Sequence, residues 1–129
     1  MRVCRIERDG RTEAAFYLDE QVIPLSDAAQ AVGVEGPQGD DLVPLLPGGG
    51  QRASVVRLQQ ACEGLSHDAR AALAVPTGDV SLRVPVPAPR KLMLLAGNYS
   101  KHVEETGGQA EVREKTFPYV FMKPPSTTL

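Results

Sequence analysis

The chain has 129 residues, 42% of them hydrophobic and 23% charged, and its formal net charge is -2. This length allows one domain, or one small domain with part of a second, and the interleaved acidic and basic residues form no basic stripe of the kind that binds nucleic acid. No apolar run approaches the roughly 20 residues that cross a membrane, and the charged N-terminus is unlike a signal peptide, so the sequence predicts a cytoplasmic protein without a membrane partner.

The N-terminal residues predict a small antiparallel meander followed by a short helix. Three segments have the composition and alternation of strands: 1–6, 14–18 and 21–25. Asp9-Gly10 is typical of a two-residue hairpin turn between the first two strands. We expect Ser26 and Asp27 to cap a helix that ends at Gly33.

Two further helices are expected before residue 76. Apolar side chains recur at helical spacing from about 51 to 63, and Ser66 is expected to cap a shorter helix over 68–74. Cys4 and Cys62 are far apart and lack the spacing of metal ligands, so we interpret both as reduced thiols of a cytosolic protein.

A change of composition near residue 80 predicts a domain boundary. Over 79–90, prolines alternate with other residues, which is typical of an edge strand or a linker. We therefore expect an N-terminal α+β domain over 1–78 and the start of a second domain over 91–129. The continuous apolar run at 91–96 predicts a strand that is buried on both faces.

A helix after this strand places two ionisable side chains together. Ser100 can cap a helix over 101–105, on which His102 and Glu105 are three residues apart and share a face. A carboxylate beside an imidazole fixes the ring tautomer and raises its basicity, which suits a general base that activates water. From the spacing alone, a solvated helix surface is the simpler interpretation.

A second strand over 119–123 carries a lysine beside aromatic residues. Tyr119, Phe121 and Lys123 fall on one side of this strand. Such a face could line a pocket that binds an anion, although a lysine that reaches solvent from a strand end explains the same pattern. The polar residues 109–116 are expected to form an exposed loop or a lid.

The order of these residues is more specific than any one of them. A buried strand, Gly97-Asn98-Tyr99, His102, Glu105, a loop and then Phe121-Met122-Lys123-Pro124 with Ser126 follow one another. Over roughly residues 88–129 this order resembles the fumarylacetoacetate hydrolase (FAH) family. The resemblance implies an α+β chain in which the N-terminal meander and helices precede the first strands and lid helix of an incomplete FAH-type mixed-sheet catalytic domain.

The resemblance implies a hydrolase that cleaves a carbon–carbon bond in a β-diketo or 2-oxo acid, such as an acylpyruvate, as in aromatic catabolism. It implies His102 as the catalytic base, Glu105 as its dyad partner and Lys123 as the group that stabilises developing negative charge. Three further residues match positions around the substrate pocket: Asn98, Tyr99 and Ser126. Family members that are hydratases, decarboxylases or isomerases share the motif and stay open as alternatives.

The resemblance also implies a Mg²⁺ or Mn²⁺ ion, held by a Glu-x-Glu pair and a later Asp beyond the Lys123 strand, and this chain has no match to them. Glu7-Arg8-Asp9 has a similar spacing but enters the predicted hairpin turn. We therefore assign no metal ligand. We expect a truncated or partial enzyme, inactive alone, that forms a homodimer or associates with a missing C-terminal part; a non-catalytic assembly module is the alternative of another class.

Overall fold

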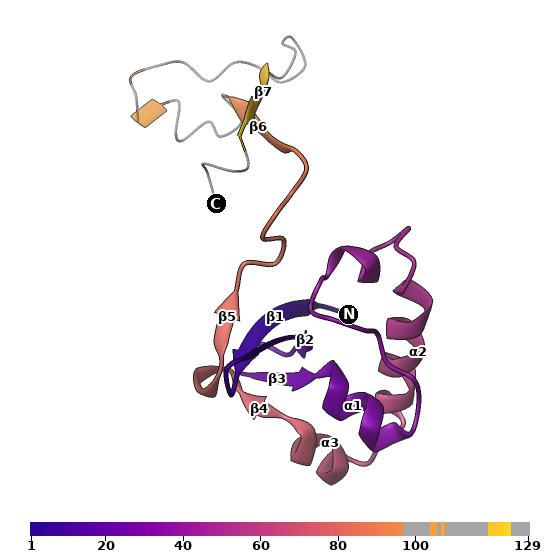
Figure 1. Ribbon diagram of the computed structural model, residues 1–129. Coiled ribbons are helices and arrows are strands. Elements are labelled where there is room, and N and C mark those ends of the chain that lie inside the picture. The colour runs from indigo at the N-terminus through magenta and orange to yellow at the C-terminus, as the bar shows by residue number, and fades with distance from the viewer. Residues whose placement is uncertain (97–103, 106, 108–118, 125–129) are drawn as a thin grey trace. The chain divides into compact units, whose positions relative to one another are not determined.

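The computed structural model describes residues 1–96, 104–105, 107 and 119–124 (Figure 1). The chain forms two compact units, Met1–Val86 (unit 1) and Pro87–Leu129 (unit 2). Its elements, in chain order, are β1 Val3–Arg8, β2 Arg11–Tyr17, β3 Gln21–Pro24, α1 Leu25–Val32, η1 Val43–Leu45, α2 Arg52–Glu63, α3 His67–Leu73, β4 Val75–Pro76, η2 Thr77–Asp79, β5 Ser81–Arg83, β6 Leu92–Ala96 and β7 Tyr119–Lys123. The chain is therefore mixed α+β, as the sequence predicts.

Unit 1 is built on a five-stranded sheet in the order β4-β3-β2-β1-β5, with antiparallel neighbours throughout. The predicted meander forms its centre, where β1 and β2 pair from Val3 opposite Phe16 to Arg8 opposite Arg11. The intervening Asp9-Gly10 turn has φ values of 52° and 73°. A two-residue hairpin turn of type I′ needs positive φ at both positions, which explains the Asp-Gly pair.

Helices α1 and α2 pack on one face of this sheet (Figure 1). Phe16 and Ile23 from the sheet, Ala28 from α1 and Leu58 from α2 belong to one buried cluster, together with Leu45 of η1. Burial of these side chains supplies the hydrophobic stabilisation of unit 1. None of the helices in the described ranges is both long and apolar enough to cross a membrane.

The opposite face of the sheet holds a smaller core. Ile6, Ala15 and Val22 are fully buried there, and Val75 and Val80 pack against them. Because β4 pairs with β3 at one edge and β5 pairs with β1 at the other, the segment that carries both valines links the two edges of the sheet. The Pro-rich stretch thus begins as an edge strand of unit 1.

The start of α1 differs from the prediction. The helix begins at Leu25, and no side chain caps its first turn. The Ser26 hydroxyl instead donates to the Glu13 carboxylate at 2.7 Å, and Asp27 accepts a hydrogen bond from Arg8 at 2.9 Å. Both predicted capping groups are therefore used by tertiary partners on the neighbouring hairpin.

Candidate active site

The candidate site residues belong to unit 2, whose described strands form an antiparallel hairpin. β6 and β7 pair from Leu92 opposite Lys123 to Ala96 opposite Tyr119. The strands expected over 91–96 and 119–123 are both present. They belong to a two-stranded sheet, so each strand has one hydrogen-bonded neighbour among the described residues.

Burial of this hairpin differs from the prediction for its first strand. Met93 and Leu95 in β6 are 63% and 48% exposed, and their cross-strand partners Met122 and Val120 are 68% and 51% exposed. These four side chains form one face, which we call the methionine face. The expectation that the apolar run is buried on both faces is wrong for the chain as described, because a two-stranded sheet has little to cover it.

The pairing register places Lys123 at the end of β7, opposite the first residue of β6. Lys123 is exposed and lies opposite Leu92, the first residue of β6. The chain leaves β6 at Ala96, four residues or about 13 Å further along at the usual strand rise, on its way to His102. The hairpin register by itself therefore does not bring Lys123 to the point at which the chain turns towards His102.

The other predicted residues are described only in part. Glu105, like Glu104 before it, has helical backbone and an exposed side chain, which agrees with the helix expected over 101–105. Four predicted residues lie outside the described ranges: His102, Asn98, Tyr99 and Ser126. The distance between His102 and Glu105 is thus a prediction from spacing alone.

Carboxylates elsewhere in the described ranges do not fit a divalent cation. No group of three or more His, Cys, Asp or Glu side chains converges among these residues. Glu7 forms an ion pair with Arg83, and Asp40 forms one with Arg5, whose hydrogen bond and, to a lesser extent, charge lower the pKa of that carboxyl. A hard cation needs several convergent oxygens, so we assign these residues no metal and no step of a reaction through one.

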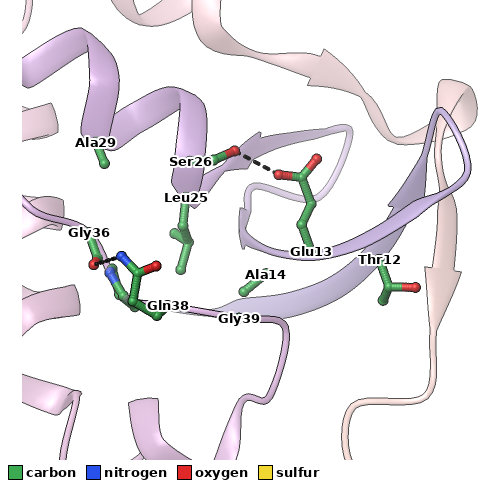
Figure 2. A pocket seen from close by; sticks show the side chains of 10 residues that line it. Thr12, Glu13, Ala14, Leu25, Ser26, Ala29, Gly36, Gln38 and Gly39 are labelled. Carbon is green, nitrogen blue, oxygen red and sulfur yellow. Dashed lines mark hydrogen bonds between the residues drawn. The ribbon is translucent and has the colours of Figure 1, made fainter.

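Unit 1 contains a pocket of about 360 Å³ that the sequence did not predict (Figure 2). The start of β2, the first turn of α1 and the loop over 36–39 line it. Gly36 permits the close approach, because a Cβ there would lie 2.8 Å from the Cβ of Ala29. The sequence signal for such a loop is the Gly-Pro-Gln-Gly run at these positions.

The Glu13 and Ser26 side chains that line this pocket already have partners. Figure 2 shows the Ser26 hydroxyl turned towards Glu13, and the second Glu13 oxygen lies 3.1 Å from Arg8. Arg8 also donates to Asp27, and this hydrogen bond raises the pKa of the guanidinium. The arrangement joins the β1–β2 hairpin to α1, and it has the character of a structural network rather than of a site for acid–base chemistry.

Comparison with known proteins adds no family to these observations. No protein-family model matches the chain, and no curated protein matches it.

Proposed function

We propose that this chain belongs to an FAH-type enzyme that cleaves a carbon–carbon bond in a 2-oxo or β-diketo acid. The observation that carries the proposal is the order of distinct residues along one unit: Gly97-Asn98-Tyr99 after β6, then His102 and Glu105, then Lys123 at the end of β7. The β6–β7 pairing and the helical backbone at Glu105 support this interpretation, because they supply the strand, helix and strand that the motif requires.

The proposed chemistry assigns one role to each residue. His102 takes a proton from water, whose oxygen attacks a substrate carbonyl, and Glu105 holds the imidazole in the required tautomer. The bond to the adjacent carbon then breaks, and its electron pair stays on the leaving fragment as an enolate. Lys123 stabilises the negative oxygen of that enolate, and His102 returns the proton to carbon.

The test is hydrolysis of an acylpyruvate, followed by the loss of its enol absorbance, with Mg²⁺ or Mn²⁺ present. The protein is assayed alone and with any chain that co-purifies with it. We expect His102→Ala to lower turnover by about 100- to 10,000-fold, the usual contribution of a positioned general base. Glu105→Gln should also lower it, whereas Glu104→Gln, one residue away on the same helical segment, is the matched control. Undiminished turnover in His102→Ala would contradict the assignment.

The exposed methionine face favours a second candidate, a module that mediates assembly. Every buried apolar residue in the described ranges lies in unit 1, while the hairpin exposes Met93 and Met122 by more than 60%. A hairpin of this kind gains stability when another chain covers it. Absence of turnover on a panel of 2-oxo acids by the chain together with its co-purifying partner, with no specific binding of Mn²⁺, would favour this candidate over the enzyme; hydrolysis of any of these acids would exclude it.

A further inference from the structure

Positive charge gathers at the open end of the β6–β7 hairpin. Lys123 lies opposite Leu92, and Arg90 and Lys91 directly precede Leu92. Standard strand geometry puts the Cα atoms of Lys91 and Lys123 within about 8 Å of each other. All three cations are exposed, and none forms an ion pair with another residue in the described part of the chain. We call Arg90, Lys91 and Lys123 the basic hairpin end.

An aromatic side chain lies beside this charge on the same side of the sheet. Phe121 is two residues from Lys123, so both side chains project from one face about 7 Å apart. Phe121 is 43% exposed, and Tyr119, next along that face, is 70% exposed. The four side chains of the methionine face, on the opposite side, are all apolar. The hairpin is therefore asymmetric, with its cation and aromatic rings together.

We propose that the basic hairpin end and Phe121 form a binding site for an amphipathic carboxylate, in which the anionic group meets the cations and an apolar group lies on the ring. The like charges of Lys91 and Lys123, whose Cα atoms lie within about 8 Å of each other, repel, and Arg90 directly before Lys91 adds to this; a bound carboxylate reduces that repulsion while Phe121 loses contact with water. The choice of a 2-oxo acid as the carboxylate rests on the proposed function. The 7 Å spacing favours acids with an aryl or extended acyl group over pyruvate itself.

The test uses amide NMR spectra of the 129-residue chain, recorded with EDTA so that metal binding does not contribute. The probes are phenylpyruvate, pyruvate and inorganic phosphate. We expect phenylpyruvate to shift the amide signals of residues 90–94 and 119–123 saturably, with an affinity at least fivefold higher than that of pyruvate or phosphate. Cross-strand NOEs between Leu94 and Phe121, or the residue replacing it, report whether the hairpin is formed in each variant.

Substitutions on the two faces provide the control. Lys123→Gln and Phe121→Ser should each weaken phenylpyruvate binding at least fivefold, whereas Met122→Ser, on the methionine face, should leave it within twofold. Lys91 lies outside the strands, so Lys91→Gln should leave the hairpin formed and still weaken phenylpyruvate binding. This variant therefore tests the site even where a substitution within a strand disrupts the hairpin. Equal affinity in Lys91→Gln and the parent, equal weakening by Met122→Ser, or phosphate binding as tight as that of phenylpyruvate would each overturn the proposal.

These experiments distinguish a failure of the proposed binding site from a failure of the proposed enzyme. Saturable phenylpyruvate binding, with no acylpyruvate hydrolysis by the chain together with its co-purifying partner, would contradict the proposed enzyme and leave this site standing. Hydrolysis that depends on His102, with phenylpyruvate binding insensitive to Lys91 and Phe121, would contradict this site alone.

Discussion

Two adjacent glycines in the loop before α2 give opposite predictions for the same substitution. A Cβ built on Gly49 would lie 2.2 Å from the carbonyl oxygen of Pro44 and 2.5 Å from its carbon, whereas one on Gly50 would meet nothing within 4 Å. Neither glycine has a positive φ, so the difference between them is steric. We expect Gly49→Ala to destabilise unit 1 and Gly50→Ala to be tolerated.

The expected loss in the free energy of unfolding follows from the contacts of the Pro44 peptide. It accepts the Gln51 amide at 2.9 Å, and Leu45, the next residue, is 1% exposed in the main core. Moving this peptide costs about 1 kcal/mol for the hydrogen bond and about 1–3 kcal/mol for displaced core packing. Gly49→Ala should therefore cost about 2–4 kcal/mol in the free energy of unfolding. Gly50→Ala should change it by less than about 1 kcal/mol, because only chain entropy is affected.

Urea unfolding followed by far-UV circular dichroism measures both variants. A loss of about 2–4 kcal/mol lowers the urea midpoint of a small unit by about 1 M or more, while the slope stays constant. Equal midpoints for Gly49→Ala and Gly50→Ala would refute the reasoning, since they would show that the loop moves without cost to the hydrogen bond or to the core.

Three further predictions concern unit 1. Leu58→Ala, at a fully buried position, should cost about 2–5 kcal/mol in urea unfolding, while Leu46→Ala, at a position 44% exposed, should cost less than about 1 kcal/mol. Arg2 lowers the pKa of Asp19 by hydrogen bonding and charge. The pair therefore stabilises the fold above pH 4, and this stabilisation is lost as the pH falls through the folded pKa. The Tm difference between the parent and Asp19→Asn should shrink below pH 4. Desolvation raises the pKa of the half-buried Cys4 thiol, so at pH 8 Cys4 should react with Ellman's reagent more slowly in the folded chain than in urea, and equal rates would contradict this.

Local signals predicted most elements of unit 1. The Asp9-Gly10 turn and the apolar stripe on α2 are confirmed, as is the Ser66 cap, whose hydroxyl accepts the Ala69 amide at 3.2 Å. These features depend on residues close in sequence, so the sequence alone expresses them. The missing side-chain cap on α1 could not be predicted from nearby residues. The Ser26 hydroxyl bonds Glu13 only because the hairpin folds against the helix.

Features that depend on residues distant in the sequence were harder to predict from the sequence alone. β4 has two residues, which is too short for a periodic signal, whereas the alternation over 79–90 predicted an edge strand or a linker where β5 lies. The pairing of β4 with β3 and of β5 with β1 joins segments more than 50 residues apart and was not predicted. The pocket at Gly36 likewise arises only where a loop meets α1. For the candidate site, spacing predicted the hairpin strands, but the four-residue offset of Lys123 from Ala96 follows only from the pairing register.

The distribution of buried residues bears on how the proposed site could work. Catalytic groups must be held to within about 0.5 Å, and a two-stranded hairpin in water is marginally stable at best. The core residues of the described chain all lie in unit 1, whereas Lys123 lies on a hairpin whose methionine face is open to solvent. Covering Met93 and Met122 would stabilise the strand that positions Lys123. Under the proposed function, a partner that buries the methionine face would also order the proposed catalytic lysine, so the proposed catalysis would depend on assembly.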